Sequence, residues 1–397
     1  MHARRINLLD PELYAQGLPL DTYDWLRDNA PVYWHEEPDG GPGFWVLTGL
    51  DTVRSVGRSP KAFASRPTTM IPDGATMGDE VHRNLIFNDP PEHAAQRRVI
   101  VEDFLPKAAK ALEPRIERIA SDLLDEVEAR GSCDLVEDLA GVLASYVIAE
   151  LLGIPHEDGK RLYYLTEVIQ RGISLSEGEG LAAVQEMFGY AHSVWESRRA
   201  TPTGDLPSRI AHGHIGDREI DEMDFNLYFL LLINAGGDTS RNVIGGGMAE
   251  LLRHPDQVKD LRENVDELLP GAVEEMLRWV CPIIYQRRTA TAPAVVGGQQ
   301  IEAGQKVVMF YAAANFDPKV FDRPREFAIR RSPNPHISFG AAGPHHCLGA
   351  HVARIEIAAM VRALLRRFPT LELDGPLVWS SSTIMNGPTN VPIRFRR

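Results

Sequence analysis

Apolar positions follow a helical spacing along most of the chain, with shorter β-like runs near its start and around residues 283–311. From Glu92 to about Phe368, apolar residues recur every three or four positions, which is typical of amphipathic helices. The run FWVLTG and the Gly-punctuated run TAPAVVGGQQIEAGQKVVMFY favour strands instead. The pattern predicts a mainly α fold with a smaller β-rich region.

One predicted helix departs from this pattern because glycines interrupt its middle. Residues 220–253 would form a helix of about 34 residues, roughly 50 Å long. Each interior glycine costs about 1 kcal/mol relative to alanine. Close helix packing is one explanation, above all for the triple glycine at 245–247. For Gly236 and Gly237 we favour the alternative that something flat approaches the helix backbone closely.

Asp238 and Thr239 follow these glycines in the middle of the same apolar segment. Both side chains compete for backbone hydrogen bonds and are poor choices inside a helix. A solvated helix face would explain such a pair in isolation. The flanking run LYFLLLIN favours an interior position instead. A polar pair buried there would be more easily explained by a chemical function than by packing.

The composition is that of a folded globular protein with an acidic surface. The 397 residues include 42 Lys and Arg against 55 Asp and Glu, so the formal net charge is −13, and 44% of the residues are hydrophobic. This balance disfavours a nucleic-acid partner, which needs clustered basic residues. The length alone allows two or three domains or one large domain.

Targeting signals are not evident in the sequence. The longest apolar run, 229–233, is far short of the roughly 18 residues that span a bilayer, and the N-terminus lacks the apolar region of a signal peptide. The three cysteines are too few for a disulfide framework, which favours a reducing compartment. We expect a cytoplasmic protein without a membrane anchor.

Cys347 lies between a glycine-rich loop and a predicted helix, in the run HISFGAAGPHHCLGAH. The positive end of a helix dipole favours a thiolate at such a position. Three interpretations of this loop compete: an inert core cysteine, a catalytic nucleophile that needs a histidine base, and a zinc site. The zinc site would recruit His345, His346, Cys347 and His351.

Four motifs decide among these interpretations when they are taken together. The loop resembles the haem-ligand signature of the cytochrome P450 family, Phe-Gly-x-Gly-x-His-x-Cys-x-Gly, whose positions are filled here by Phe339, Gly340, Gly343, His345, Cys347 and Gly349. EEMLR resembles the family's Glu-x-x-Arg pair, AGGDTS resembles its oxygen-binding groove, and DPPEHAAQRR resembles its haem-propionate helix. Each motif alone is weak, but the four follow the family's order from residue 93 to 349. The chain is therefore identified as a member of this family.

The resemblance implies a single cytochrome P450 haem domain over residues 1–397, with a long central helix over a buried haem. It implies haem b and O₂ as cofactors, with Cys347 as the axial thiolate ligand of the iron. Asp238 and Thr239 would deliver protons. The remaining implied contacts are with the haem (His93, Arg97, Arg288, His345, Gly236, Phe339 and Gly349) or form a structural pair beneath it (Glu275 and Arg278). We choose Arg288 over Arg287 because the family pattern is Arg-x-Ala.

Three positions depart from the family pattern. Phe339 lies eight residues before Cys347 instead of the common seven, so the loop has one extra residue, as in some relatives that oxidise sterols, terpenoids and branched lipids. Phe316 stands where the family usually has an arginine. Asn234, often apolar in relatives, is either a structural amide or a hydrogen-bond donor to substrate.

The resemblance also places a substrate pocket, whose candidate residues are mostly apolar. We therefore expect a hydrophobic small molecule, such as a sterol, a terpenoid, a lipid or a secondary-metabolite intermediate. The candidates are Leu231, Asn234, Ala235, Thr239, Ile284 and Met385, with Met70, Ile71, Met77, Leu85, Ile86 and Phe87 from an earlier loop.

The predicted reaction inserts one atom of O₂ into the substrate. We expect electrons from a separate ferredoxin and a ferredoxin reductase that uses NAD(P)H, and we expect a monomer. A basic face formed by Arg354, Arg362, Arg366 and Arg367 is either simply solvated or a docking patch for an acidic ferredoxin. The alternatives are a peroxide-using or non-oxidative haem-thiolate enzyme, a non-catalytic haem-binding protein, and a zinc-thiolate protein.

Overall fold

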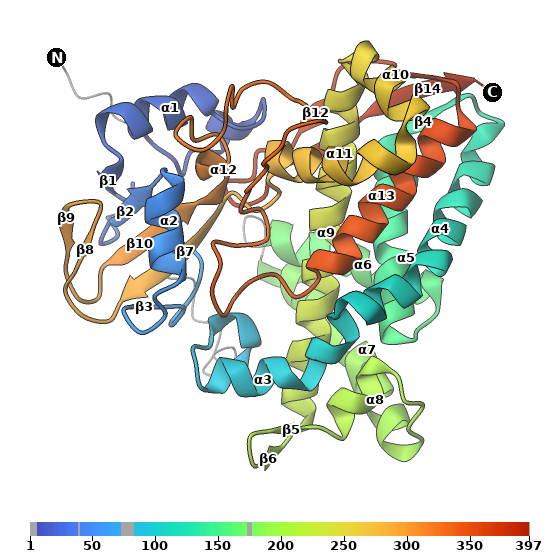
Figure 1. The fold of residues 1–397 in the computed structure, drawn as a ribbon. Coiled ribbons are helices and arrows are strands. Elements are labelled where there is room, and N and C mark those ends of the chain that lie inside the picture. The colour runs from blue at the N-terminus through green and yellow to red at the C-terminus, as the bar shows by residue number, and fades with distance from the viewer. Residues whose placement is uncertain (1–5, 39, 73–82, 173–176, 397) are drawn as a thin grey trace.

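Two hydrophobic cores organise the computed structural model, which describes residues 6–38, 40–72, 83–172 and 177–396. The larger core lies among long helices, and the smaller lies between a sheet and the short helices that cover it (Figure 1). The predicted mainly α fold with a smaller β-rich region is confirmed.

The smaller core is built on a five-stranded sheet with the strand order β1-β2-β10-β7-β3. Strand β10 (Lys306–Phe310) is central and fully buried; it runs parallel to β2 and antiparallel to β7. Its continuous run of apolar side chains, Val307 to Phe310, explains why both faces of the strand are buried. The other strands are β1 (Val32–His35), β2 (Phe44–Leu47), β3 (Phe63–Ala64) and β7 (Tyr285–Ala290), and the nearby helices are α1 (Leu20–Asn29), α2 (Leu50–Gly57) and α12 (Tyr311–Ala314).

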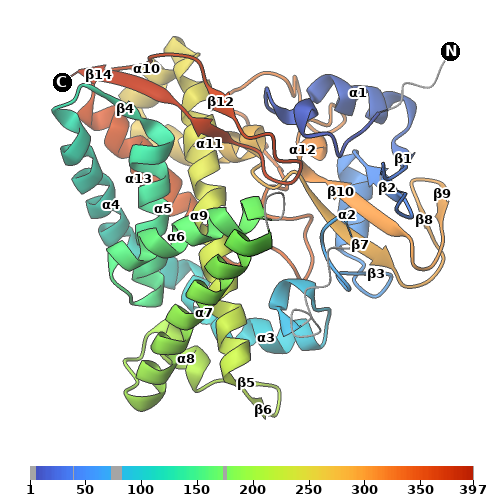
Figure 2. The same cartoon turned by 180° about the vertical axis from the view of Figure 1, so that it is seen from behind.

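The larger core surrounds one central helix, α9 (Glu222–Leu252), which packs against most of the other long helices. Figure 2 views the molecule from behind and shows α6 and α7 crossing in front of α9. The helices around it are α3 (Glu92–Ile100), α4 (Pro106–Glu128), α5 (Gly141–Leu152), α6 (His156–Gly172), α7 (Glu177–Ala200), α8 (Leu206–Ala211), α10 (Pro255–Glu263), α11 (Val265–Val280) and α13 (Ala350–Arg367).

Helix α9 is the long helix predicted from residues 220–253. It has 31 residues, and it begins after the N-cap Asp221, whose side chain forms a reciprocal capping box with Asp224. This cap satisfies backbone N–H groups that the first turn leaves open. The interior glycines, Asp238 and Thr239 all lie within the continuous helix.

Short elements complete the fold at its edges. Near the C-terminus, β14 pairs with β11 and with the earlier β4, so the two halves of the chain meet there. Among the described residues, none of the helices combines the length and hydropathy of a bilayer span. The remaining elements are β4 (Ser132–Asp134), β5 (His214–Ile215), β6 (Arg218–Glu219), β8 (Ala294–Val296), β9 (Gln299–Ile301), β11 (Thr370–Leu373), β12 (Val378–Trp379), β13 (Pro388–Asn390), β14 (Pro392–Arg396), the 3₁₀ turns η1 (Pro11–Tyr14), η3 (Leu85–Phe87) and η4 (Val101–Phe104), and the π-helical turn η5 (Leu135–Ala140).

Candidate active site

The loop from Phe339 to Cys347 runs between the two cores and ends at the start of α13. The backbone N–H of Cys347 donates to the Phe339 carbonyl at 2.8 Å, which closes the loop. Burial raises the pKa of the Cys347 thiol, while the N–H of Gly349 and the charges of Arg97 and Arg354 act to lower it. The thiol nonetheless has exposed surface. It is therefore enclosed by the protein yet accessible to a ligand.

The extra residue of this loop is accommodated against the end of α2. A Cβ at Gly57 would lie 2.7 Å from the Ala341 Cβ, and a Cβ at Gly343 would collide with the Gly57 carbonyl oxygen. Ala342 adopts the left-handed region with a φ of 59°. The loop thus bulges onto α2 while its two ends stay hydrogen-bonded.

Two histidines and two arginines from separate segments meet beside Cys347. His93 and Arg97 lie on α3, Arg288 on β7 and His345 in the loop, and the rings of the two histidines are 4.0 Å apart. The charges of both arginines act on both histidines, and Arg97 also acts on Cys347. The structure therefore brings together the four residues predicted to contact propionates.

The electrostatics of this cluster fit a group with two negative charges. Burial, followed by the charge of Arg97, lowers the pKa of His93 to about 4; burial and then Arg288 lower that of His345 to about 2. Within the described residues, neither Arg97 nor Arg288 has an acidic side chain within ion-pair distance, and the buried Nδ1 of His93 has no hydrogen-bond partner. Arg288 is buried, Arg97 is partly buried, and Asp89 acts on Arg288 from beyond ion-pair distance. A buried cation needs an anionic partner. The dianionic edge of a haem, with an accessible thiol nearby, meets that need.

Arg287 has a different function from its neighbour. Its Nη1 donates to the carbonyls of Met70 and Ile71 at 3.1 and 3.3 Å, so it fastens an earlier segment to β7. Arg288 instead lies beside His345 and His93. The predicted choice of Arg288 over Arg287 therefore matches the geometry.

Asp238 is almost completely buried on α9 and is held by two neighbours. The hydroxyl of Tyr163 on α6 donates to its Oδ1 at 3.0 Å, and Arg241 Nη2 lies 3.0 Å from the same oxygen. Arg241 also pairs with Glu167 at 2.5 Å. Asp238 thus belongs to a connected polar network that joins α6 to α9.

Thr239 lies next to this acid and is only partly buried. Its hydroxyl donates to the Ala235 carbonyl at 3.0 Å, which is the common bond of a threonine inside a helix. Asn234 and Ala235 are exposed although the helix around them is packed on most sides. These three residues mark the part of α9 that borders open space.

Glu275 and Arg278 form the predicted structural pair at the end of α11. They are fully buried, and two hydrogen bonds of 2.8 Å join them. Arg278 also donates to the carbonyls of Asn315 and Pro324, and Glu275 accepts from Arg331 at 3.0 Å. These partners belong to the segment between α12 and the Cys347 loop.

Comparison with known proteins identifies the family. The profile of the cytochrome P450 family matches residues 182–381. A Mycobacterium tuberculosis protein named putative cytochrome P450 126 is 35% identical over 408 residues, which cover 98% of this chain and 97% of that protein. The chain belongs to the cytochrome P450 family.

One further sequence relative and one solved structure are similar to this chain over nearly its whole length. A steroid C26-monooxygenase of Rhodococcus jostii is 33% identical over 98% of this chain and 84% of its own length. The structure of Mycobacterium marinum cytochrome P450 CYP268A2 in complex with pseudoionone has a TM-score of 0.90 and 30% identity, and it covers both chains completely. The protein is a cytochrome P450 monooxygenase. Enzymes of this family use haem and O₂ and act on hydrophobic substrates.

Helix packing gives the glycines of α9 a reason of its own in this P450. A Cβ at Gly236 would collide with the Ile148 side chain on α5, and one at Gly237 would lie 2.5 Å from the Tyr163 ring. Close helix packing, the alternative explanation, therefore accounts for both glycines, and the contact of Gly236 with haem stays a prediction. The triple glycine at 245–247 also packs against side chains, as the alternative explanation proposed.

Phe316 replaces the usual arginine of the family and contacts the structural pair. Its ring centre lies 5.0 Å from the guanidinium carbon of Arg278, and the rings of Trp279 and Phe321 lie at 5.6 and 5.5 Å. Aromatic rings around a buried guanidinium favour its charge. A cation–π contact therefore stands where relatives have a charged side chain.

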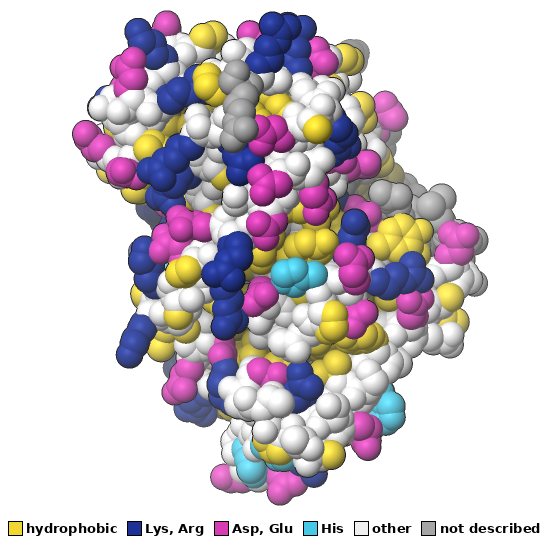
Figure 3. Space-filling model, turned by 90° about the vertical axis from the view of Figure 1, so that its right-hand side faces the viewer, with side chains coloured by type: hydrophobic (Ala, Val, Ile, Leu, Met, Phe, Trp, Pro, Cys, Tyr) yellow, Lys and Arg dark blue, Asp and Glu magenta, His cyan; other side chains and the backbone are white. Residues whose placement is uncertain are grey.

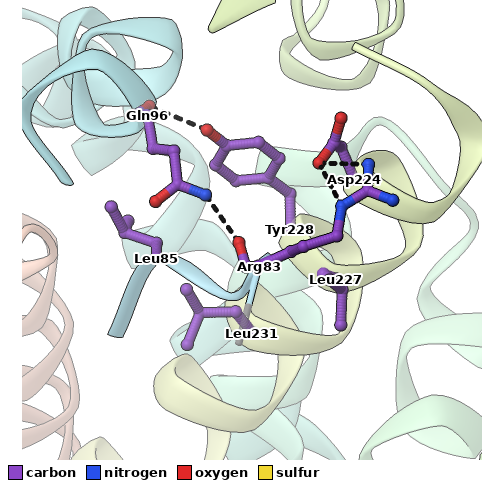
Figure 4. Close-up of a pocket in the computed structure, with 7 residues that line it drawn as sticks. All are labelled: Arg83, Leu85, Gln96, Asp224, Leu227, Tyr228 and Leu231. Atoms are coloured by element: carbon purple, nitrogen blue, oxygen red, sulfur yellow. Dashed lines mark hydrogen bonds and ion pairs between the residues drawn. The ribbon is translucent and has the colours of Figure 1, made fainter. Parts of the chain in front are cut away.

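The predicted pocket residues differ in their surroundings. Leu231 and Leu85 line one small cavity of about 10 Å³, with room for about one water molecule (Figure 4). Met385, Met70, Ile86 and Phe87 are partly buried, and Met77 lies outside the described residues. The cavity is completed by Arg83, Gln96, Asp224, Leu227 and Tyr228.

Two pocket predictions are wrong. Ile284 and Ile71 are fully buried in the smaller core, so neither lines a space that a substrate can enter. Ile283, the neighbour of Ile284, is only partly buried and bridges to Met385. Side chains alternate along an extended segment, so the prediction selected the opposite face.

The four arginines of the predicted docking patch are all paired with acids. Arg354 pairs with Glu274, Arg362 with Glu117, Arg366 with Asp266, and Arg367 with Asp125 and Glu128. Figure 3 shows basic and acidic side chains interspersed on the side of the molecule where α4 lies. Paired charges produce little field at a distance, so the pairing favours a solvated face over a docking patch, the two interpretations left open for these residues.

The polar network around Asp238 includes residues that sequence reasoning missed. Arg241 follows Asp238 by three positions, a spacing that places both on one helix face and gave a usable signal. Tyr163 and Glu167 lie on α6, and nothing in the sequence linked them to α9. Glu274 and His336, which pair at 3.0 Å near the Cys347 loop, were missed for the same reason.

Proposed function

We propose that this P450 binds haem through Cys347 and oxidises a hydrophobic substrate of the steroid class. The observation that carries the assignment is the exposed Cys347 in the loop where His345 meets His93, Arg97 and Arg288. Among the residues that the structure describes, neither Arg97 nor Arg288 has a carboxylate within ion-pair distance, and Asp89 acts on Arg288 only from farther away. When bound, thiolate-ligated haem supplies the activation of O₂, because the thiolate donates electron density that favours cleavage of the O–O bond. The N–H of Gly349 favours the thiolate form of the ligand.

The cation cluster would hold the haem at its acidic edge. Arg97 and Arg288 supply positive charge, and an arginine fork suits a carboxylate. His93 and His345, whose pKa values are lowered to about 4 and about 2, act as neutral hydrogen-bonding groups at neutral pH. His345 is oriented by the Ser65 hydroxyl, 3.0 Å from its Nε2. The cluster thereby fixes the haem in one orientation relative to Cys347.

Asp238 and Thr239 would hold and move the protons that the reaction consumes. Tyr163 and Arg241 keep the Asp238 carboxylate in place, and Thr239 presents a hydroxyl at the part of α9 that borders open space. A carboxylate linked to a hydroxyl through water is a general-acid relay. Asn234, exposed one turn before, is proposed as a hydrogen-bond donor to the substrate.

The site also supports one functional unit over residues 1–397. Arg288 comes from the sheet of the smaller core, whereas His93 and Asp238 come from helices of the larger core. Neither part alone contains the site. We infer a single haem domain.

The steroid class is proposed because of the named relative that oxidises steroids. The pseudoionone complex offers a second hydrophobic ligand for comparison. Electrons are proposed to come from a separate ferredoxin and a ferredoxin reductase that uses NAD(P)H. The test is titration of the purified holoenzyme with testosterone or with pseudoionone; a shift of the haem to high spin is expected with the steroid, and a shift with pseudoionone alone would overturn the steroid assignment.

A spectrum of the reduced, CO-treated protein tests the haem ligand. The red-shifted Soret band of a thiolate-ligated haem is expected, and a Cys347→Ser variant should lose it. A colourless protein that contains zinc would overturn the assignment, although no metal-binding group of three or more His, Cys, Asp or Glu side chains occurs in the described part of the chain. Product formation with ferredoxin, reductase and O₂, and not with peroxide alone, distinguishes the monooxygenase from a peroxide-using enzyme.

A further inference from the structure

An ion pair between Glu274 and Arg354 joins α11 to α13 beside the Cys347 loop. The Nε and Nη2 atoms of Arg354 donate to the two carboxylate oxygens of Glu274 at 2.6 and 2.9 Å. A third bond, from Arg354 Nη1 to the Ala350 carbonyl at 3.1 Å, ties the side chain to the first turn of its own helix. A bidentate pair with a third anchor has a fixed orientation.

This pair contacts the residue that closes the loop. The guanidinium carbon of Arg354 lies 4.4 Å from the centre of the Phe339 ring, a cation–π contact. The carbonyl of Phe339 accepts the N–H of Cys347 at 2.8 Å. A continuous path of three contacts thus runs from Glu274 to the backbone of Cys347.

His336 completes the clamp, by which we mean Glu274, His336, Phe339 and Arg354. Its Nε2 lies 3.0 Å from Glu274, and its ring centre lies 6.0 Å from that of Phe339. Its Nδ1 lies 3.3 Å from the backbone N–H of Ser338, which leaves Nε2 to donate to Glu274. The guanidinium that pairs with the Glu274 carboxylate in the clamp is that of Arg354.

Both charges persist under ordinary conditions. Burial alone would raise the pKa of Glu274, but hydrogen bonds from Arg354 and His336 outweigh it and bring the pKa to about 2. The positive charge of Arg354 is close enough to act on Cys347. In the partly buried clamp these charges are less screened than at an open surface, with Glu274 and Arg354 side chains 29% and 35% exposed.

We propose that the charge balance between Glu274 and Arg354 sets the reduction potential of the haem iron bound at Cys347. The inference rests on the proposed function, because it requires haem at that ligand. The step is the uptake of one electron by ferric iron from an external donor, which gives ferrous iron. No bond forms or breaks in the clamp, and no proton moves there. Reduction adds negative charge, so an unbalanced arginine favours it and an unbalanced glutamate opposes it.

Spectroelectrochemical titration of the substrate-free holoenzyme tests this proposal. Glu274→Gln keeps the shape of the side chain and removes its charge. The equilibrium constant for reduction should rise about tenfold, which is a shift of about +59 mV for a one-electron couple. Arg354→Gln should shift the potential in the negative direction, and the double variant should return toward the wild-type value. A purely structural role would not produce opposite signs.

Glu117→Gln is the matched control. It breaks the 2.8 Å pair between Glu117 on α4 and Arg362, which lies on α13 like Arg354, and it changes no contact of Phe339. Its potential should equal that of the wild type. Shifts of Glu274→Gln and Arg354→Gln in the same direction, or shifts no larger than the control, would overturn the proposal.

A charge-conserving variant covers the case in which Arg354→Gln does not retain haem. Glu274→Asp keeps the carboxylate and should stay within the range of the control, whereas Glu274→Gln should leave it; equal shifts in both variants would overturn the proposal. Failure of the proposed function is seen separately, as a wild-type protein without a thiolate-ligated haem spectrum.

Discussion

Tyr163 on α6 donates a 3.0 Å hydrogen bond to Asp238 on α9, 75 positions later in the chain. Burial and the neighbouring carboxylate raise the pKa of Tyr163, so its hydroxyl keeps its proton and remains a donor. Arg241 lies 3.0 Å from the same carboxylate oxygen. The orientation of Asp238 therefore depends on α6, which contributes both Tyr163 and Glu167, the acid that pairs with Arg241.

Asp238→Asn should reduce the rate of product formation by about 10²-fold, because the side chain can no longer carry a proton. The solvent isotope effect on the remaining rate should increase, and haem content should not change. Steady-state turnover with ferredoxin and reductase in H₂O and D₂O measures both. Tyr163→Phe keeps the carboxylate and serves as the control, with a loss of less than about tenfold. A wild-type rate in Asp238→Asn would remove the acid from the mechanism.

Thr239→Ala should divert reducing equivalents from product to hydrogen peroxide, since the hydroxyl that presents protons at the open part of α9 is lost. NAD(P)H consumption should continue while the ratio of product to NAD(P)H falls. Quantifying product, peroxide and NAD(P)H in one reaction gives the coupling. Ser240→Ala removes the neighbouring hydroxyl, which is buried, and should keep the coupling of the wild type. Unchanged coupling in Thr239→Ala would count against the proposed role.

Glu275→Gln should destabilise the protein by about 3–5 kcal/mol, because it leaves the charge of Arg278 buried without its partner. Denaturant unfolding of the holoenzyme and its haem content are the measurements. Glu372→Gln breaks the exposed pair with Arg394 and should cost less than about 1 kcal/mol. Equal effects of the two substitutions would show that the buried pair is not structural.

The sequence allowed the helices and the motif positions to be predicted because both are local. Apolar spacing marks a helix wherever it occurs, and the Glu275–Arg278 pair lies three positions apart on one helix face. The residues predicted to surround the haem were identified from contiguous sequence motifs. That these residues lie close together beside Cys347 could be predicted only from the family resemblance.

Long-range partners and strand phase could not be predicted in the same way. Each arginine of α13 found an acid on another helix, such as Glu117 for Arg362, and a single sequence does not reveal such pairings. Ile284 was chosen where Ile283 presents its side chain, because a shift of one residue reverses the face of an extended segment. The packing of Gly236 against Ile148 could not be predicted because that side chain lies on another helix.

Gly236→Ala should destabilise the protein by about 1–3 kcal/mol, since the new methyl group would collide with Ile148. Ile148→Val removes the nearest atom, so the double variant should lose less stability than the sum of the single variants. Gly189→Ala in α7 is the control, because nothing lies within 4 Å of its Cβ position, and it should be neutral or stabilising. Additive effects of Gly236→Ala and Ile148→Val would contradict the packing explanation.

Glu356 on α13 gives the stability of the protein a predictable pH dependence. Burial raises its pKa to about 8 although the Ser240 hydroxyl acts to lower it; no charged side chain is among the causes, and its Oε1 has no hydrogen-bond partner. The folded protein therefore holds a proton that the unfolded chain releases above about pH 4.5.

The sign of the effect follows from linkage. The contribution of Glu356 is fully favourable below about pH 4.5, falls by up to about 1.4 kcal/mol per pH unit as the pH rises, and becomes constant above about pH 8. Glu356→Gln removes the ionisable group and with it this pH dependence. Between about pH 4.5 and pH 8, the unfolding free energy of the variant should therefore rise relative to that of the wild type as the pH increases. Chemical unfolding at pH 5, 7 and 9 measures it, with the exposed Glu137→Gln as control. A difference that stays constant with pH would mean that Glu356 ionises normally in the folded protein.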